Sequence, residues 1–465
     1  MPKIVFIQPK FTAVKLDRNI KTIFPLGFGY LAAYVPEHWD VSIVDEQIET
    51  IDFDMAVDVV GLSTTTLTIN RAYEVATEFR KRGVTVFLGG VHVSMCPDEA
   101  QPFCDAVCIG DGEQVIAQML TDFENKCLQK VYNHKSGMHS LDGIRFPRYE
   151  LFKPGYSFLP FSTSRGCPFD CNFCSINKFY DGKYRKRDVE EVITDLKRIP
   201  KGYDTLFITD GNMYGYSKSD ASRFKEICRR MAEERRKGSF NFKQFTCYAS
   251  VNALQDDEAL DLAAAAGCRL LSIGFESINP DSLKDMNKVM NLKIGVDKYP
   301  ELIANAQKRK IMVLGEILLG SDSDDMRVLE ETRKFVQIAG FDILRLQILQ
   351  PFPGTETFEQ LKREGRLHLK QFPEDWQKIT DHFIMGVHYD LKKMDTLEFL
   401  HAVKEIGMDF YSLKNIAKRA LSTLTTTQSI KECARIMVIN LKSRKSYVNE
   451  DVTLWKIPEK TPEPV

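Results

Sequence analysis

The sequence predicts an α/β fold in which two runs of alternating strands and helices are followed by a mostly helical segment. Short apolar runs bounded by turn residues alternate with stretches of helical periodicity up to about residue 360. This alternation is interrupted at 136–160, which is rich in Pro, Gly and aromatic residues. Beyond 360 the apolar residues recur at helical spacing, as at 394–421. We therefore expect four segments: a first domain at 1–135, a surface linker at 136–160, a second domain at 161–360 and a helical domain at 361–465.

The composition excludes several classes of protein. Hydrophobic residues make up 43% of the chain, as in ordinary globular proteins, and 63 Lys and Arg balance 64 Asp and Glu. This balance argues against a dedicated nucleic-acid-binding protein, and no apolar run is long enough to span a membrane. The N-terminus lacks a signal-peptide pattern, so we expect a cytoplasmic protein whose eleven cysteines are thiols or metal ligands.

The first domain predicts a doubly wound sheet. We expect strands at 3–9, 41–47, 58–64, 84–90 and 105–113, with helices at 25–35, at 68–82 and after 113. Ligands of such sheets bind beyond the carboxyl ends of the strands. Small or polar residues occupy those ends here: Ser63, Thr64, Thr65, Thr66, Gly89, Gly90, Gly110, Asp111, Gly112 and Glu113. Neither a phosphate-binding loop nor a dinucleotide-binding motif is present.

Three cysteines lie close together in the sequence, Cys167, Cys171 and Cys174, with the spacing C-x3-C-x2-C. We expect the other eight to be small buried core residues. A disulfide would leave one of the three unpaired, and a structural zinc site would need further ligands that do not follow. An iron–sulfur cluster normally takes four thiolates, so three would leave one iron open to a small molecule.

The sequence of the second domain predicts six strands, at 161–166, 205–210, 243–250, 269–277, 311–320 and 343–355. The helices between them are expected at 188–199, 218–237, 256–266, 297–309 and 324–339. Functional side chains of such domains lie at the carboxyl ends of the strands, where Asp210, Asn212 and Glu276 stand. The basic segment 182–187 is expected to be a solvated turn; the alternative is that Arg185 or Arg187 reaches a carboxylate or phosphate.

The cysteine motif, with Phe173 before its last Cys, resembles the signature of radical S-adenosylmethionine enzymes. The resemblance implies a partial (β/α)6 barrel in which Cys167, Cys171 and Cys174 hold a [4Fe-4S] cluster. The open iron would bind S-adenosylmethionine, and an electron from a donor such as ferredoxin or flavodoxin would split it to a 5′-deoxyadenosyl radical. Further contacts to S-adenosylmethionine are implied at Phe173, Asp210, Asn212, Glu276 and Gly315, with Glu276 accepting the ribose hydroxyls. The segment after the second strand departs from the Gly-Gly-Glu-like sequence that is frequent in the family.

The first domain resembles the Rossmann-like cobalamin-binding domain that precedes the radical domain in many family members. The resemblance implies cobalamin contacts at Ser63, Thr64, Thr65, Thr66, Gly89, Gly90, Gly110 and Glu113. The loop at 9–19 lacks the His that binds cobalt in other members. Two alternatives follow: cobalamin bound without a His ligand from the protein, which we expect, or a domain that has lost cobalamin. His92 is expected to be a hydrogen-bonded structural residue.

The combined resemblance implies a cobalamin-dependent radical C-methyltransferase acting on an unactivated carbon. A protein or peptide side chain is slightly favoured as substrate, with lipids and tetrapyrroles also open. The alternatives are a radical cyclase and, from another class, a metal-stabilised binding protein without catalysis. Candidate substrate contacts in the helical domain are Trp376, His382, His388 and Tyr389.

Overall fold

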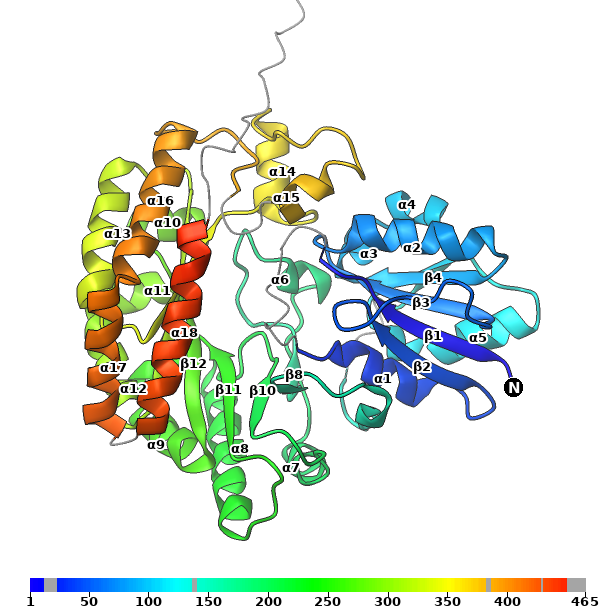
Figure 1. The fold of residues 1–465 in the computed structure, drawn as a ribbon, viewed down its shortest axis with the longest axis horizontal. Coiled ribbons are helices and arrows are strands. Elements are labelled where there is room, and N and C mark those ends of the chain that lie inside the picture. The colour runs from blue at the N-terminus through cyan, green and yellow to red at the C-terminus, as the bar shows by residue number, and fades with distance from the viewer. Residues whose placement is uncertain (12–22, 136–139, 382–385, 428–429, 450–465) are drawn as a thin grey trace, which may run out of the picture.

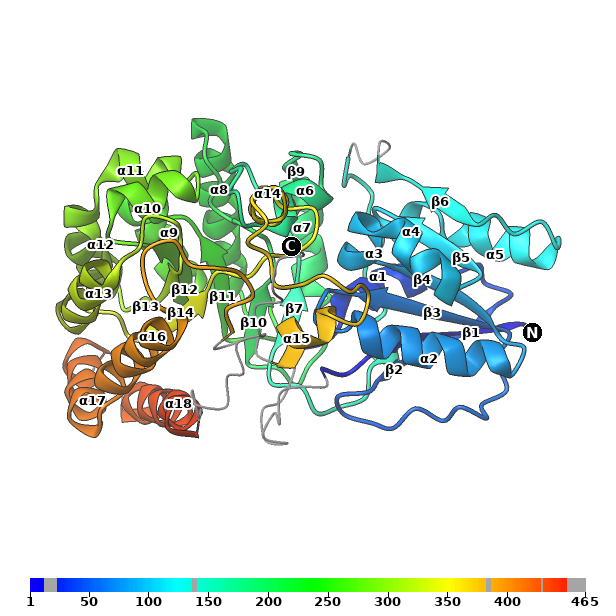
Figure 2. The ribbon, with the colours of Figure 1, turned by 90° about the horizontal axis from the view of Figure 1, so that it is seen from above.

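The computed structural model describes residues 1–11, 23–135, 140–381, 386–427 and 430–449. Within these ranges it contains two six-stranded parallel sheets that lie side by side, with helices around each (Figure 1, Figure 2). This arrangement is the α/β class that the sequence predicts. His382 lies outside the described residues.

The N-terminal sheet has the strand order β2-β1-β3-β4-β5-β6. Its strands are β1 (Lys3–Gln8), β2 (Asp40–Asp45), β3 (Val59–Thr64), β4 (Thr85–Gly90), β5 (Ala106–Ile109) and β6 (Val131–Asn133). Its helices are α1 (Leu26–Tyr34), α2 (Ile69–Lys81), α3 (Val91–Met95), α4 (Pro97–Ala100) and α5 (Ile116–Glu124). The central strands are apolar and buried in their middle parts because helices cover both faces of the sheet. The short elements α3, α4 and β6 were not expected.

The second sheet has the order β14-β13-β12-β11-β10-β7, so its two edge strands are not paired with each other and the barrel is partial. Its strands are β7 (Leu159–Phe161), β10 (Thr205–Ile208), β11 (Gln244–Ala249), β12 (Cys268–Glu276), β13 (Met312–Leu319) and β14 (Ile343–Ile348). A separate antiparallel pair is formed by β8 (Ser164–Arg165) and β9 (Arg185–Lys186).

Helices alternate with these strands. They are α6 (Ser175–Phe179), α7 (Val189–Lys197), α8 (Lys218–Arg236), α9 (Asp257–Ala266), α10 (Pro280–Asp285), α11 (Val289–Ile294), α12 (Tyr299–Lys308) and α13 (Met326–Ile338). Their ends follow local chemistry: a capping box of Ser217 and Asp220 begins α8, and Gly267, with φ +100°, ends α9.

The C-terminal segment contains α14 (Glu356–Arg363), α15 (Trp376–Asp381), α16 (Thr396–Phe410), α17 (Leu413–Thr427) and α18 (Ile430–Asn449). The helical stretch expected at 394–421 is divided between α16 and α17. The division falls at Tyr411, whose hydroxyl donates to the Leu344 carbonyl and accepts from the Leu344 amide. Among the helices of the described residues, none combines the length and apolar character that a membrane span requires.

Two expectations about 136–166 are corrected. The strand expected at 161–166 is β7 at 159–161, because the chain then leaves the sheet: Asp210 accepts hydrogen bonds from Thr163 and Ser164, and β8 pairs with β9. The expected surface linker contributes buried side chains. Tyr149 and Tyr156 pack against Phe24, and Tyr156 donates to Asp45 of the N-terminal sheet.

Candidate active site

A cavity of about 440 Å³ lies between the two sheets. One wall comes from α1 and from the carboxyl ends of β1, β3, β4 and β5, the edge at which ligands of parallel sheets bind. The other wall includes Gly166 and Ser175, which stand on either side of the three cysteines. One cavity therefore adjoins both the strand ends of the N-terminal sheet and the cysteine loop. The described residues that line it include no histidine.

Small residues keep this cavity open. Seven of the predicted cobalamin contacts line it, namely Ser63, Thr64, Thr65, Gly89, Gly90, Gly110 and Glu113. Gly90 has φ +95°, and a Cβ atom there would lie 2.4 Å from the Thr64 backbone nitrogen, so only glycine fits. Thr66 does not line the cavity, because its side chain bonds to His92.

Tyr30 is a cavity residue that sequence reasoning missed. Its side chain is buried, and its hydroxyl has no hydrogen-bond partner in the described residues. Burial raises the pKa of Tyr30 to about 12, so the phenol keeps its proton and can donate. A buried hydroxyl without a partner costs about 1–3 kcal/mol unless a ligand supplies one. This unpartnered donor and the glycine-lined space fit a large ligand with polar side groups, such as a corrinoid.

Two acidic residues of the N-terminal domain are paired with arginines of the second. Asp111 lies 3.1 Å from Arg165 and 2.7 Å from Arg185, and Glu113 lies 2.5 Å from Arg165. All four side chains are nearly buried, and the Arg165 guanidinium also lies over the Tyr30 ring. The expected solvated turn at 182–187 is therefore wrong in part, since Arg185 and Arg187 are buried. The ion pairs close the cavity where the two domains meet.

Two hydrogen bonds join the cysteine loop to the loop after α10. The Asn172 amide donates to the Met286 carbonyl, and the Asn287 side chain donates to the Asp170 carbonyl. All eleven cysteines lie in the part of the chain that the structure describes, and none of them forms a disulfide there. Burial raises the pKa of Cys167 to about 11 and that of Cys171 to about 12, so each thiol needs a cation or metal to ionise. Three unpaired thiols on one short loop fit a metal cluster.

Glu276 and Lys288 form a buried ion pair, 3.0 Å apart, beside these thiols. Burial raises the pKa of Glu276, although the Lys288 ammonium opposes this. Glu276 has φ +62°, and a Cβ at Gly274 would lie 2.3 Å from the Glu276 carboxylate, so the side chain lies against its own strand. Non-glycine residues in this backbone region are strained and concentrate at functional sites. Sequence reasoning missed Lys288 because it placed functional side chains at the carboxyl ends of strands, and Lys288 does not lie at one.

The other predicted contacts to S-adenosylmethionine have structural partners. The Asp210 carboxylate accepts from Thr163 and Ser164, and the Asn212 side chain donates to Ser250 and accepts from the Gly215 amide. Phe173 packs partly buried against the main core. A Cβ at Gly315 would lie 2.4 Å from the Phe341 ring, so this glycine makes room for a core aromatic residue. Asp210 thus shapes the backbone leading into the cysteine loop.

His92 is buried, as expected for a structural residue. Its Nδ1 lies 3.0 Å from the Thr66 hydroxyl and its Nε2 lies 3.1 Å from Glu99. Glu99 also accepts from the Tyr73 hydroxyl and from Trp376 Nε1. With Cys96, His92 and Glu99 are close enough to share an ion, but hydrogen bonds within the protein already occupy the imidazole and the carboxylate.

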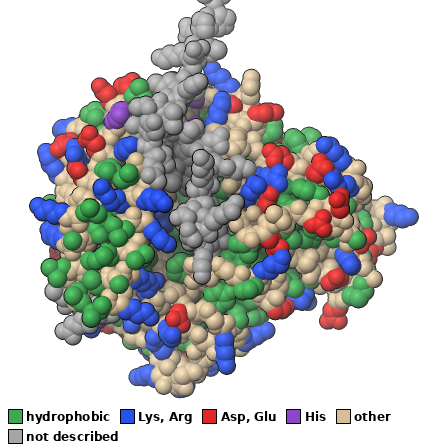
Figure 3. Space-filling view, in the orientation of Figure 1, with side chains coloured by type: hydrophobic (Ala, Val, Ile, Leu, Met, Phe, Trp, Pro, Cys, Tyr) green, Lys and Arg blue, Asp and Glu red, His purple; other side chains and the backbone are tan. Residues whose placement is uncertain are grey.

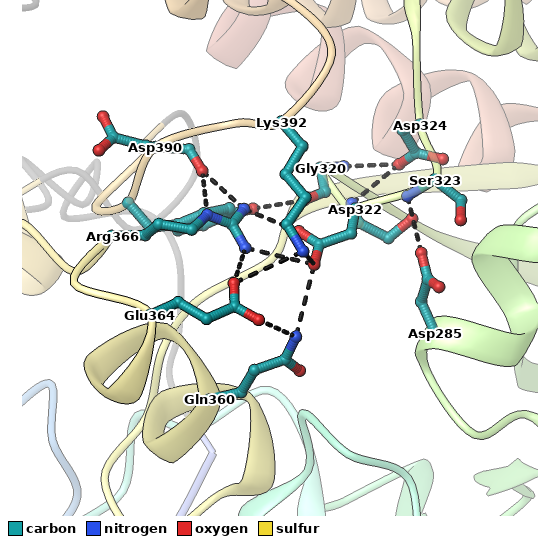
Figure 4. A network of polar contacts seen from close by, with 12 residues as sticks. Asp285, Gly320, Asp322, Ser323, Asp324, Gln360, Glu364, Arg366, Asp390 and Lys392 are labelled. Carbon is teal, nitrogen blue, oxygen red and sulfur yellow. Dashed lines mark hydrogen bonds and ion pairs between the residues drawn. The ribbon is translucent and has the colours of Figure 1, made fainter.

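The candidate substrate contacts of the C-terminal segment are buried in the described residues. Trp376 donates to Glu99, and Tyr389 donates to the Gly320 carbonyl at the end of β13. His388 is also buried. Figure 4 shows how the segment is fastened nearby: Arg366 lies 2.7 Å from both Asp322 and Glu364, with Lys392 alongside. These side chains hold the segment against both domains.

Comparison with protein-family models gives two matches. The model of the Radical SAM superfamily matches residues 161–336, and that of the B12 binding domain matches residues 21–120. The first match contains the three cysteines and Glu276, and the second contains β3 and β4 with Gly89 and Gly90, which line the cavity.

Three curated relatives are similar to most of the chain. The bacteriochlorophyllide d C-12(1)-methyltransferase of Chlorobaculum tepidum is 29% identical over 90% of this chain and 89% of its own. The C-8(2)-methyltransferase of the same organism is 27% identical over 87% and 89%. The hopanoid C-2 methylase of Rhodopseudomonas palustris is 28% identical over 74% and 65%.

The fold is similar to that of a solved structure. The radical S-adenosylmethionine methyltransferase TsrM from Kitasatospora setae, solved with cobalamin and a [4Fe-4S] cluster, superposes with a TM-score of 0.69. The match covers 96% of this chain and all of that one, at 16% identity. It confirms the predicted fold: an N-terminal α/β domain, a partial barrel and a helical C-terminus.

Proposed function

Because the chain belongs to the cobalamin-binding radical S-adenosylmethionine family, we propose that it methylates an unactivated carbon atom of its substrate. One observation carries this proposal. A single cavity joins the strand ends of the B12-binding domain to the cysteine loop of the radical domain. Methyl donation and radical generation can therefore act on one substrate enclosed between the two domains.

Cys167, Cys171 and Cys174 would hold the [4Fe-4S] cluster, and the cavity residues, including Tyr30, would hold cobalamin. When bound, the cluster with S-adenosylmethionine supplies radical chemistry, and cobalamin supplies the methyl group. The residues of the chain bind and orient the cofactors and enclose the substrate between the two domains. Glu276 offers a carboxylate to the ribose hydroxyls of S-adenosylmethionine, and Lys288 offers an ammonium to its carboxylate.

Asp210 and the ion pairs between the domains have supporting roles. Asp210 fixes Thr163 and Ser164, and so fixes the direction in which the chain enters the cysteine loop. The pairs of Arg165 with Asp111 and Glu113 close one side of the cavity against water. Exclusion of water protects a reactive radical from side reactions.

A tetrapyrrole is the substrate class that we propose, with a polycyclic lipid as the second candidate. Two relatives that cover most of the chain are methyltransferases of bacteriochlorophyllide d, and a third is a hopanoid methylase. These relatives weigh against the peptide side chain that the sequence slightly favoured. The electron donor would be a small redox protein such as ferredoxin or flavodoxin.

Anaerobic turnover with S-adenosylmethionine carrying a deuterated methyl group tests the function. The reconstituted protein should show corrinoid absorption, release 5′-deoxyadenosine and transfer labelled methyl to a bacteriochlorophyllide. Cys171→Ala should lose cluster iron and 5′-deoxyadenosine formation, because two thiolates cannot hold the cluster. The matched control is Cys228→Ala, buried in α8, which should retain both at a cost of about 1 kcal/mol.

Two results would contradict the proposal in different ways. Zinc in place of iron, with no cleavage of S-adenosylmethionine, would remove the radical chemistry. Formation of 5′-deoxyadenosine without methyl label in the product would keep the radical chemistry and exclude methylation. This second result would favour ring closure as the reaction, since an anaerobic magnesium-protoporphyrin IX monomethyl ester cyclase of Rubrivivax gelatinosus is 25% identical over 77% of the chain.

A further inference from the structure

The outward face of α17 and α18 is apolar. Ile430 is 80% exposed, Leu421 61% and Val438 51%, and Leu413, Met437, Leu441 and Val448 are also exposed. Figure 3 shows hydrophobic side chains gathered over α17 and α18, with Lys and Arg around them. Surface helices ordinarily turn polar residues toward water. A contiguous apolar face of this kind marks an interaction surface.

The opposite face of the same helices already packs on the barrel. Ala420 and Ile436 join a core cluster with Met312, Leu314 and Ile343 of β13 and β14. Asn440 donates to the Asp342 carbonyl, and the Tyr447 ring packs on Gly407 of α16. Since these contacts fix the inward face, the apolar outward residues are left for a partner outside the fold described here.

The charge of the two helices identifies the kind of partner. Residues 413–449 contain eight Lys and Arg and one acidic residue, Glu432, whereas the whole chain has 63 Lys and Arg and 64 Asp and Glu. Lys414, Lys418, Lys431 and Lys442 are exposed on the same faces as the apolar side chains. An apolar stripe flanked by lysines is the pattern of helices that lie in the interface of an anionic bilayer.

We propose that the α17–α18 face binds the surface of a membrane that contains anionic lipids. The apolar side chains would enter the headgroup region while the lysines meet the lipid phosphates. Neither helix is apolar enough to cross a bilayer, so the contact is peripheral. This proposal is independent of methyl transfer, because vesicle binding needs no turnover.

Flotation of the anaerobically reconstituted full chain with vesicles tests the proposal. Vesicles of phosphatidylcholine and phosphatidylglycerol should carry the protein upward at low salt, and phosphatidylcholine alone should carry it far less. Each lysine near an anionic surface strengthens binding by about fivefold, so Lys418→Glu with Lys442→Glu should weaken it by about 25-fold or more. Leu421→Ser with Val438→Ser should also weaken binding, through lost apolar burial.

Matched variants on other surfaces control for charge and apolarity. Lys201→Glu with Lys218→Glu changes the same charge on exposed sites of the barrel. Met326→Ser with Ile338→Ser removes two exposed apolar side chains of α13. Both pairs should float as the parent does. A parent protein that stays unbound with anionic vesicles, or control variants that lose as much binding as the α17–α18 variants, would overturn the proposal. A dimer would also overturn the proposal if sedimentation showed that Leu421→Ser with Val438→Ser converts it to a monomer. The face would then join two copies of the chain.

Discussion

The residue that most directly reports on the cavity is Tyr30, because its buried hydroxyl has no partner in the described residues. We expect Tyr30→Phe to weaken cobalamin binding by about two- to tenfold, the value of one net hydrogen bond. The free energy of unfolding of the protein without cobalamin should not fall, since no protein hydrogen bond is removed. An absorption titration with hydroxocobalamin and a urea melt measure the two quantities.

Tyr34 gives the matched control on the same helix. Its hydroxyl accepts a hydrogen bond from the Arg145 backbone, and it does not line the cavity. Tyr34→Phe should leave cobalamin affinity unchanged. If Tyr30→Phe instead lowers stability and leaves the affinity unchanged, Tyr30 is a packing residue and the cofactor has no contact with it.

Residue types that carry their own chemistry were visible in the sequence. The spacing of the three cysteines and the place of Glu276 at a strand end made them candidates, and the family resemblance implied the role of Glu276 toward ribose hydroxyls. Asp210 and Asn212 end a strand in the same way, but their oxygens accept from Thr163, Ser164 and Gly215. Those partners come together only in the fold. Tyr30 could not be distinguished from an ordinary core aromatic, because its unpartnered hydroxyl is a property of the packed structure.

At the scale of elements, α15 joins the C-terminal segment to the N-terminal domain. Trp376 Nε1 donates to Glu99 at 2.9 Å, and Thr380 donates to the Leu67 carbonyl. We expect Trp376→Phe to lower the free energy of unfolding by about 1–3 kcal/mol more than the loss of ring volume does, because Glu99 loses a buried donor. Backbone hydrogen exchange in α15 should become faster in the same variant. Urea melts and exchange mass spectrometry measure these effects.

Trp39→Phe isolates the hydrogen bond from the change of ring. Trp39 is also buried, and its Nε1 has no partner in the described residues. Its replacement should cost packing alone and leave exchange in α15 as in the parent. If Trp376→Phe and Trp39→Phe lower the free energy of unfolding equally, the hydrogen bond to Glu99 adds nothing to the docking of α15.

Periodicity located most elements because it depends on neighbours along the chain. It failed where a contact from a distant residue redirects the backbone: Asp210 turns the chain out of the sheet after β7, and Tyr411 meets Leu344 where α16 ends. The short helices α3 and α4 are too brief to show a period. Their role in carrying His92 and Glu99 depends on Trp376, which lies far along the sequence.

For the whole molecule, the decisive contact is between the two domains. The pattern Gly110-Asp111-Gly112-Glu113 was predicted to meet a cofactor, and the segment 182–187 to meet water. In the structure Asp111 pairs with Arg165 and Arg185, and Glu113 with Arg165, across the boundary. Sequence alone could not pair them, because each side also makes sense as a separate surface. The pairing turns two incomplete walls into one cavity.

This contact leads to the last prediction. Arg165 holds two carboxylates whose side chains are less than a tenth exposed. Arg165→Met leaves the buried Glu113 without its arginine partner, whereas Asp111 keeps its ion pair with Arg185. Removing one member of a buried pair costs about 3–5 kcal/mol, and adding Glu113→Gln should recover part of this loss. Cobalamin affinity should fall in the single variant because the walls of the cavity separate. Arg363→Met, which breaks an exposed pair with Glu356, should cost at most about 1 kcal/mol and leave affinity unchanged. Urea melts and hydroxocobalamin titration of the four proteins, parent included, decide the matter. If Arg165→Met is as stable as the Arg363 control, the ion pairs of Arg165 do not hold the two domains together.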